Sequence, residues 1–500
     1  MRRPAAEDPG ASRPDDPLGT AAAGPAAIRG GAVRTAGYAA GVLLSLVAVP
    51  FLVRHLGVDG FGRYQTVIAI ATIAQGLTEF GVAIVALREW STARGDARRE
   101  AMRRLLGLRL AMTVAGVAGA TAFAALAGYD EVLVAGALAA SVGLGVAAVQ
   151  TFLMTALVGD LRFGWTTGLE LSKSALAVTG LLLLVVAGAS LGPFFLVPLA
   201  SALPALAVTA WLVRGRMPLR PAWRAGAWWP LVRQTLPVAA ASGVYVAYFR
   251  VAIIVMSLLA TAEQTGYFAT AYRVVEVLAA LPALALTAAF PILSRAAAED
   301  PERLRYGVAR VFEAALIGGV WLAVAVVLAA PLAIEVIAGP GFEPAVGILQ
   351  LQGLTLAASA LASAMSFVLL AQHLNRVVLV ANVGALALAV ALQVSVVPSF
   401  EATGAAAATL FAEVVLAVWC TGAAARSGAR LRPNPRVVGA ALGLGVAAGA
   451  LALAPLPPIV ALLAGTALYF GGLALGGCFP RDVAQALAGR LRGPGTGAAA

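Results

Sequence analysis

Charged residues are scarce in this chain. They make up 12% of its 500 residues, whereas hydrophobic residues make up 61%. A soluble globular protein carries about 25% charged residues, so the shortage excludes an ordinary soluble domain. Histidine and cysteine are rarer still, with two of each. His55 and His373 lie far apart in the sequence, as do Cys420 and Cys478, so neither a metal site nor a redox motif can be assembled from them. We therefore expect no metal and no cofactor.

Motifs of hydrolytic enzymes are also missing. No glycine-rich loop followed by Lys-Ser or Lys-Thr is present, which excludes ATP hydrolysis by this chain. The segment GASLG at 188–192 matches the nucleophile-elbow pattern, but it lies at the boundary of an apolar run and has no His–acid pair to complete a triad. The chain is therefore predicted not to be an enzyme.

What the sequence has in abundance is long apolar runs. A membrane-spanning helix needs about 20 mostly apolar residues, and the mean hydropathy of +0.89 is typical of a protein built from such helices. We predict an all-α integral membrane protein with about 14 transmembrane helices. The expected spans are 34–54, 64–87, 105–127, 132–158, 166–188, 191–213, 234–259, 264–290, 308–330, 345–371, 377–398, 402–425, 437–455 and 457–477.

The basic residues are distributed unequally around these spans. With the N-terminus inside, the inner loops and both tails carry nearly all of the arginines, and the outer side carries only Arg54 and Arg63. The positive-inside rule then predicts a multi-pass protein of the bacterial inner membrane with both termini cytoplasmic. The same rule accounts for the basic pI without a nucleic-acid partner. The inner arginines could in addition bind anionic membrane lipids or attract a phosphorylated substrate.

The chain also contains two similar halves. FLMTALVGDLRF (152–163) resembles FVLLAQHLNRVV (367–378), and GVDGFGRYQTV (57–67) has a weaker counterpart in ATAEQTGYFATA (260–271). Because six crossings return the chain to its starting side, we predict two parallel, pseudo-symmetric six-helix lobes with the substrate between them, followed by two extra C-terminal helices. The expected parts are a disordered cytoplasmic tail (1–33), an N-lobe (34–213), a cytoplasmic linker (214–233), a C-lobe (234–425), the extra helices (437–477) and a second cytoplasmic tail (478–500).

Arg250 lies inside an apolar run, AYFRVAIIVMS, where a charge costs roughly 2.5 to 3.5 kcal/mol. Arg273 is expected at a similar depth on the next helix, and Glu276 shares its helix face three residues later. Since guanidinium groups bind phosphate oxygens bidentately, we expect this set to line a cavity and bind an anionic head group. The alternative is structural: Glu276 neutralises one arginine, and the three residues join the two helices. The set carries one excess positive charge in either case.

Other acids also fall within the expected spans. Glu79 has no basic residue within one helical turn, so it is a candidate for ion coupling. Lys173 follows Glu170 by three residues, which predicts a pair within one helix. Glu313 and Glu413 are expected near cytoplasmic helix ends, where partial solvation would leave them without a role.

Three segments resemble the polysaccharide-biosynthesis family of oligosaccharide flippases (Wzx-type). They are PFLVRHLGVDGFGRYQTV (50–67), TEFGVAIVALREWS (78–91) and TGYFATAYRVVEVLAALPALALTAAFPILSRA (265–296). This family belongs to the multidrug/oligosaccharidyl-lipid/polysaccharide exporter superfamily, which also holds multidrug-and-toxin extruders and lipid II flippases. The resemblance covers about residues 30–430 and rests on texture and topology, without a catalytic signature.

The resemblance implies a flippase that works by alternating access. Its substrate would be a polyprenyl-pyrophosphate-linked oligosaccharide, moved from the cytoplasmic to the periplasmic leaflet for capsule, exopolysaccharide or O-antigen (lipopolysaccharide) synthesis. The expected partners are this substrate, membrane lipids and, downstream, a polysaccharide polymerase and glycosyltransferases. Two alternatives remain open: a cation-coupled multidrug exporter of the same fold, and a non-transporting membrane scaffold for glycan-assembly enzymes.

Overall fold

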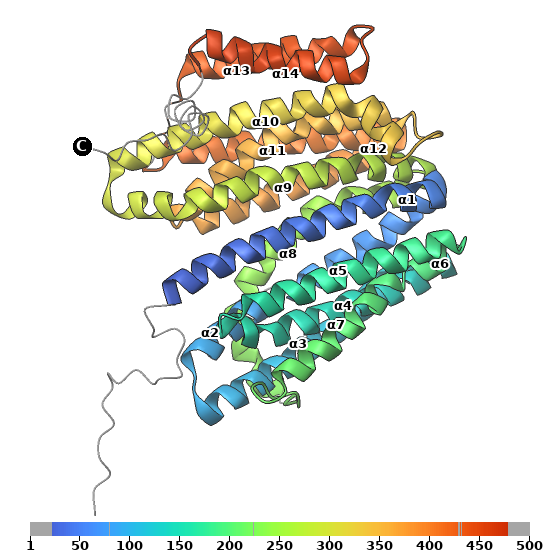
Figure 1. Cartoon of the computed structure of the whole chain (residues 1–500), viewed down its shortest axis with the longest axis vertical. Helices are drawn as coiled ribbons and strands as arrows, with labels where there is room; N and C mark the ends of the chain where they lie inside the picture. The colour runs from blue at the N-terminus through green and yellow to red at the C-terminus, as the bar shows by residue number, and fades with distance from the viewer. Residues whose placement is uncertain (1–22, 80, 224, 429–430, 432, 479–500) are drawn as a thin grey trace, which may run out of the picture. The chain divides into compact units, whose positions relative to one another are not determined.

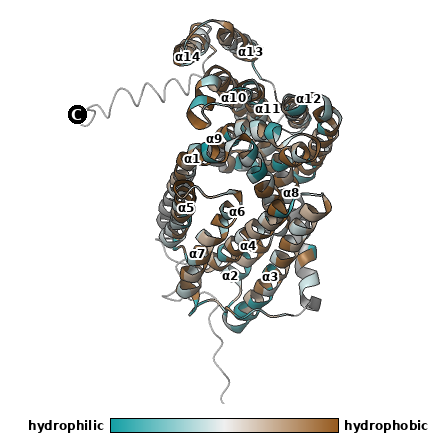
Figure 2. Cartoon of the chain, turned by 90° about the vertical axis from the view of Figure 1, so that its right-hand side faces the viewer, coloured by the Kyte–Doolittle hydropathy of each residue, from teal (hydrophilic) through white to brown (hydrophobic). Residues whose placement is uncertain are grey.

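The computed structural model describes residues 23–79, 81–223, 225–428, 431 and 433–478, and the regular elements in this part of the chain are all helical. Hydrophobic residues prevail along most of these helices (Figure 2), as expected for elements that lie in lipid. The prediction of an all-α membrane protein is confirmed. The elements are α1 (Ala23–Glu79), α2 (Val82–Thr92), α3 (Gly95–Leu126), α4 (Glu131–Gly159), α5 (Phe163–Val186), α6 (Leu191–Phe194), α7 (Val197–Val213), α8 (Ala225–Leu259), α9 (Ala262–Glu299), α10 (Pro301–Ile337), α11 (Ala345–Ala371), α12 (Asn375–Arg426), α13 (Pro435–Gly449), the short 3-10 helix η2 (Ala450–Leu453) and α14 (Pro458–Leu475).

Among the described residues, ten helical stretches are long and apolar enough to cross a membrane. Two of them, Ala39–Thr92 and Asn375–Arg426, each hold two of the predicted spans. In each case a residue with a positive φ interrupts the helix: Gly57 (φ 67°) in α1 and Glu401 (φ 48°) in α12. The predicted spans 234–259 and 264–290 correspond to α8 and α9. Every predicted span therefore has a helical counterpart.

The chain divides into two compact units. Unit 1 comprises the residues up to Leu52 together with Ile70–Gly243, and unit 2 comprises Val53–Ala69 and the residues from Val244 onward. The break at Gly57 therefore falls in a segment of α1 that packs with the second unit. The boundary after Gly243 lies inside α8.

In unit 1, α4 packs against both α3 and α7, and α5 packs against α7 (Figure 1). The buried core where α2, α3 and α4 meet includes Trp90, Met102 and Phe152. After α7 the chain returns along α3, where the Ala222 N–H donates a hydrogen bond of 2.9 Å to the Arg103 carbonyl oxygen. The return brings the turn after α7 close to the beginning of α3.

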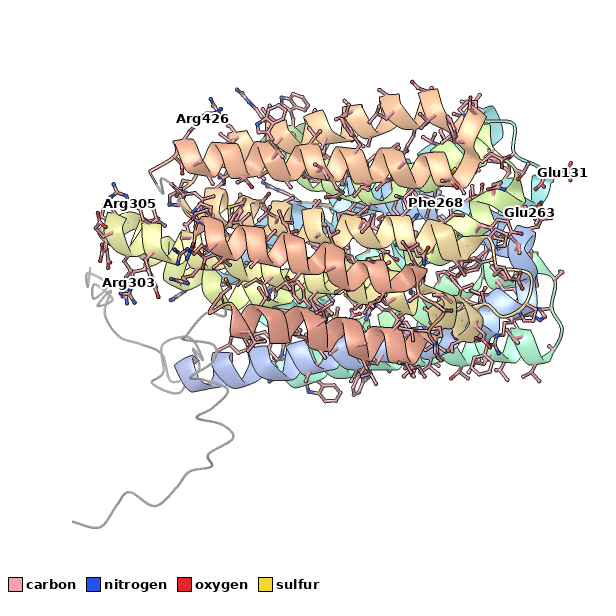
Figure 3. The ribbon with its side chains drawn as sticks, turned by 90° about the horizontal axis from the view of Figure 1, so that it is seen from above. Glu131, Glu263, Phe268, Arg303, Arg305 and Arg426 are labelled. Atoms are coloured by element: carbon pink, nitrogen blue, oxygen red, sulfur yellow. The ribbon has the colours of Figure 1, made fainter. Side chains whose placement is uncertain are left out.

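In unit 2, α10 and α11 pack side by side, α9 and α12 pack on α11, and the hairpin of α13 and α14 packs on α10 (Figure 1). The Tyr469 hydroxyl of α14 donates a buried hydrogen bond of 3.0 Å to the Ile317 carbonyl oxygen of α10. Figure 3 shows Arg303, Arg305 and Arg426 at one end of the unit 2 helices and Glu263 at the opposite end. The charge asymmetry expected from the sequence therefore runs along the helix axes of this unit.

Residues 53–69 cross the start of α9 at very short range. A Cβ atom at Gly62 would overlap the Ala262 carbonyl oxygen, and one at Gly266 would overlap the Val58 carbonyl oxygen. The two contacts are reciprocal, because each glycine faces the residue four positions before the other. Only glycine allows two helices to approach so closely. These are the segments that the sequence pairs as repeat counterparts.

Candidate functional site

The structure brings Arg250, Arg273 and Glu276 together inside unit 2. Arg250 lies on α8, and Arg273 and Glu276 lie one helical turn apart on α9. The short turn at Ala260 and Thr261 folds these two helices back on each other and so brings the three residues together. An Nη2 hydrogen of Arg250 donates to Oε1 of Glu276 at 2.5 Å, and an Nη1 hydrogen of Arg273 donates to Oε2 at 2.8 Å. Both carboxylate oxygens are therefore bonded to an arginine.

One carboxylate serves two guanidinium groups, so the three side chains carry one excess positive charge. The structural bridge between two helices, which the sequence left as the alternative, is thus present. Each guanidinium has five N–H donors, and within the described residues each of these two donates a single hydrogen bond. The side chains of Arg250 and Arg273 are 14% and 29% exposed. Donors therefore remain for a further acceptor, most of all on Arg273.

A second acid, Glu413 of α12, lies close to this set. Glu276 and Glu413 line the same small cavity of about 30 Å³, together with Tyr248 and Gln352. A cavity of this size holds about one water molecule. The Tyr248 hydroxyl lies beside the Glu413 carboxylate, and the Gln352 amide, 1% exposed, has no hydrogen-bond partner among the described residues. The cavity is therefore small and mostly apolar, with two acids, Glu276 and Glu413, in its lining.

The expectation that Glu313 and Glu413 are partly solvated is wrong. Glu413 is 5% exposed and has no basic partner in the part of the chain that the structure describes. It lies midway along the second half of α12, and helices α8 and α11 cover it. Glu313 is 2% exposed and accepts hydrogen bonds from Arg310 (2.8 Å) and from the backbone N–H of Asn434 (3.1 Å), which joins α10 to the start of α13.

Three other predicted polar residues, Glu79, Glu170 and Lys173, lie in unit 1. Lys173 and Glu170 form the expected pair on α5, with 2.7 Å between Nζ and Oε2. The Glu79 side chain lies outside the described residues, so its predicted role in ion coupling stays a prediction. Thr78 is the residue that precedes Glu79, and its carbonyl oxygen accepts a hydrogen bond of 3.0 Å from Arg109 of α3. Arg109 and Thr78 are 31 residues apart in the sequence, so this hydrogen bond could not be predicted from sequence spacing.

Solved structures show the same fold. The lipid II flippase MurJ, in an inward closed conformation, matches with a TM-score of 0.72 and 13% identity, over 91% of this chain and 99% of that chain. A multidrug resistance MATE family transporter of the MOP superfamily, in an inward-facing conformation, matches with a TM-score of 0.60 and 14% identity, over 76% and 92%. A MOP superfamily transporter from Pyrococcus furiosus, for which reverse polarity of the binding pocket suggests a different function, gives 0.53 and 16%, over 80% and 96%.

A comparison with curated protein sequences gave no match. The sequence does match the family described as "Polysaccharide biosynthesis protein" over residues 27–297, which is more than half of the chain. This match confirms the family to which the segments around Tyr64 and Tyr267 point. The chain belongs to the polysaccharide biosynthesis protein family.

Proposed function

We propose that this chain is an inner-membrane flippase for a lipid-linked oligosaccharide. Its substrate would be a polyprenyl-pyrophosphate-linked glycan, moved from the cytoplasmic to the periplasmic leaflet by alternating access for capsule, exopolysaccharide or O-antigen synthesis. The family and the fold shared with a lipid II flippase support this proposal. A pyrophosphate-sugar head group cannot cross hydrocarbon unaided, because burying an unpaired charge is prohibitive.

The observation that carries the proposal is the excess positive charge held by Arg250, Arg273 and Glu276 within the spans. A cation in a membrane segment is costly and usually marks a substrate or ion pathway. The unused N–H groups of the two arginines suit the oxygens of a phosphate or pyrophosphate. Glu276 would hold both guanidinium groups in place until the head group replaces part of this pairing.

Flipping of a fluorescent polyprenyl-pyrophosphate oligosaccharide in proteoliposomes tests the proposal. We expect R250Q/R273Q to abolish flipping. Because that variant leaves Glu276 without a counter-charge, the neutral triple variant R250Q/R273Q/E276Q guards against loss of folding and should be equally inactive. R295Q is the matched control, since Arg295 lies on α9 in a loose, exposed pair with Glu299 at 3.7 Å. Wild-type flipping by a folded triple variant would rule out the assigned role of the arginines.

A specific observation favours one second function. Glu413 is a buried acid without a basic partner among the described residues, and an exporter coupled to a cation needs such an acid. If the chain is a cation-coupled multidrug exporter, E413Q should abolish drug efflux in cells while R250Q/R273Q leaves efflux intact. If the chain is a flippase, the arginine variant is the inactive one. A non-transporting scaffold would retain its cellular role in both variants.

A further inference from the structure

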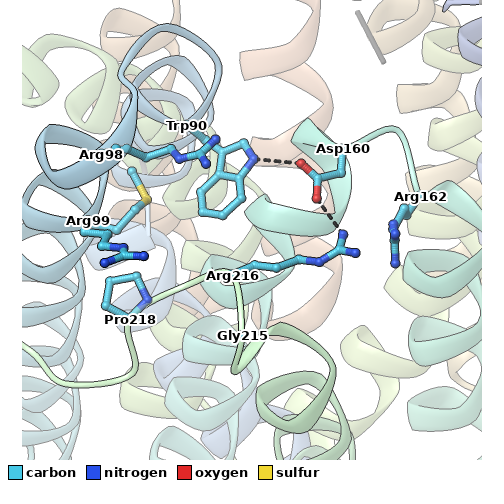
Figure 4. Close-up of a pocket in the computed structure, with 10 residues that line it drawn as sticks. Trp90, Arg98, Arg99, Asp160, Arg162, Gly215, Arg216 and Pro218 are labelled. Carbon is cyan, nitrogen blue, oxygen red and sulfur yellow. Dashed lines mark hydrogen bonds and ion pairs between the residues drawn. The ribbon is translucent and has the colours of Figure 1, made fainter. Parts of the chain in front are cut away.

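A large pocket lies at the end of unit 1 that the arginine distribution predicts to be cytoplasmic. It has a volume of about 660 Å³, within the range of small-molecule sites. We call it the arginine pocket, after the four arginines that line it with one aspartate and a tryptophan: Arg98, Arg99, Arg162, Arg216, Asp160 and Trp90. These residues come from the end of α2, the start of α3, the turn between α4 and α5 and the turn after α7 (Figure 4).

Asp160 holds the pocket together. Its Oδ1 accepts a hydrogen bond of 3.2 Å from the Trp90 indole N–H, and its Oδ2 accepts one of 2.8 Å from Arg216 (Figure 4). The Arg98 guanidinium stacks on the Trp90 ring, 4.6 Å from the ring centroid. Three elements that are distant in sequence are therefore fixed around one carboxylate.

The positive charge of the arginine pocket exceeds what its acid can neutralise. Asp160 is already paired with Arg216. Arg162 has no ion pair within the described residues, and Arg98 has only its stacking contact with Trp90. Arg99 faces Asp96 at 3.7 Å, but both side chains are largely exposed, and such pairs contribute little. Several guanidinium groups therefore converge on one space with most of their donors unused, an arrangement that suits a multiply charged oxyanion.

An apolar groove lies further along the same helices. It has a volume of about 670 Å³ and is lined almost entirely by apolar side chains of α3 and α4, among them Leu110, Val117, Leu138 and Val149. On α3 the groove begins at Leu110, eight residues after Met102 of the arginine pocket. At 1.5 Å per residue this is about 12 Å deeper into the membrane. In the predicted orientation the cationic pocket therefore lies at the membrane interface, and the apolar groove lies deeper, within the hydrocarbon.

The geometry points to a binding site for a lipid diphosphate, with the diphosphate in the arginine pocket and the start of the chain along the groove between α3 and α4. Such a site holds the lipid on the cytoplasmic side before translocation. The inference deepens the proposed function and rests on it for the direction of transport. Binding in detergent requires no translocation. The binding experiment therefore tests the site independently of the flippase activity, and either one can be disproved without the other.

Binding to the purified full chain is measured with four probes. A polyprenyl diphosphate carries head and tail, the matching polyprenol carries only the tail, inorganic pyrophosphate carries only the head, and phosphatidylglycerol carries a single phosphodiester. We expect the polyprenyl diphosphate to bind at least tenfold more tightly than each of the other three. Its affinity should fall as salt is raised, because exposed guanidinium groups are screened.

Variants of the pocket locate the site. R98Q/R162Q should weaken binding of the polyprenyl diphosphate at least tenfold and leave polyprenol binding unchanged. R88Q/R220Q is the control, because Arg88 and Arg220 are exposed and lie outside the pocket lining. Ala122→Phe, in the groove, should weaken the lipid diphosphate but not pyrophosphate. Thermal melts verify that all variants fold.

Three results would overturn the inference. In the first, R98Q/R162Q binds the lipid diphosphate as tightly as the wild type. In the second, pyrophosphate alone matches the lipid diphosphate and Ala122→Phe has no effect, which would identify a site for free anions. In the third, phosphatidylglycerol binds as well as the diphosphate, which would identify a general site for anionic phospholipid.

Discussion

The two acids that line the small cavity of unit 2 have opposite surroundings. Glu276 accepts hydrogen bonds from Arg250 and Arg273, whereas Glu413 has no cation beside it among the described residues. Removing the charge of Glu276 leaves two cations in a membrane segment. Removing the charge of Glu413 removes the energetic cost of burying an unpaired carboxylate. The same substitution should therefore destabilise the protein at Glu276 but not at Glu413.

We expect Glu276→Gln to lower the free energy of unfolding by about 3 kcal/mol, the order of the cost of an unbalanced charge within a span. Glu413→Gln should cause no loss of stability. Both are measured by thermal unfolding in detergent. Glu299→Gln on α9 is the control, because its exposed pair with Arg295 contributes about 0 to 1 kcal/mol. Equal destabilisation by Glu276→Gln and Glu413→Gln would contradict the difference in pairing.

The sequence predicts the grouping of Glu276 with the two arginines, but it does not predict the burial of Glu413. Arg273 and Glu276 are one helical turn apart, and the depth of Arg250 follows from its distance to the same turn, so local geometry brings the three together. The burial of Glu413 depends on α8 and α11, which are remote from it in sequence. The arginine pocket also depends on contacts that are remote in sequence, because Trp90, Asp160 and Arg216 meet only where α2, α4 and α7 pack together.

At the scale of the helices, two interruptions use the backbone differently. Gly57 has φ 67° and ψ −176°, a conformation that is essentially restricted to glycine. Glu401 has φ 48° and ψ −133°, close to the first central position of a type II′ turn, where glycine is preferred. The break in α1 therefore has the residue that its conformation requires, Gly57, whereas the break in α12 has Glu401, whose backbone is strained in that conformation.

Glu401→Gly should raise the free energy of unfolding by about 1 kcal/mol, because glycine adopts this conformation without strain. Gly57→Ala should lower it by about 1 to 3 kcal/mol. Thermal unfolding followed by tryptophan fluorescence measures both changes. Gly318→Ala is the control, since Gly318 lies within α10 with open space around its Cα, and alanine there should be neutral or slightly stabilising. A Glu401→Gly variant that unfolds earlier than the wild type would show that the side chain, and not the backbone, decides stability at this turn.

Hydropathy predicts the positions of these helices well, because apolar content over about 20 residues is a local property of the sequence. It does not predict whether two spans are separated by a loop or by a single distorted residue. In α12 the turn between the two predicted spans is reduced to Pro398 and the residues up to Glu401, which are too few to form a polar loop. The crossing of Gly62 and Gly266 is likewise visible only in three dimensions.

At the scale of the whole molecule, the arginine distribution predicts which end of the helices faces the cytoplasm. Within unit 2, Arg303 lies at the end predicted to be cytoplasmic and Glu263 lies at the other end (Figure 3). They lie at the starts of α10 and α9, and α9 has 38 residues. At 1.5 Å per residue it is about 57 Å long, well beyond the hydrocarbon thickness of about 30 Å. If α9 spans the membrane, as the sequence predicts for 264–290, the two positions lie on opposite sides of it.

Single cysteines at these positions test the orientation. In a background with Cys420→Ala and Cys478→Ala, we expect Glu263→Cys to react with a membrane-impermeant maleimide in spheroplasts, where only the periplasmic face is exposed. Arg303→Cys should react only in inverted membrane vesicles. The physical reason is the positive-inside rule, which retains arginine-rich loops in the cytoplasm. Labelling of Arg303→Cys in intact spheroplasts, with no labelling of Glu263→Cys, would show that unit 2 has the opposite orientation and that its arginine-rich end faces the periplasm.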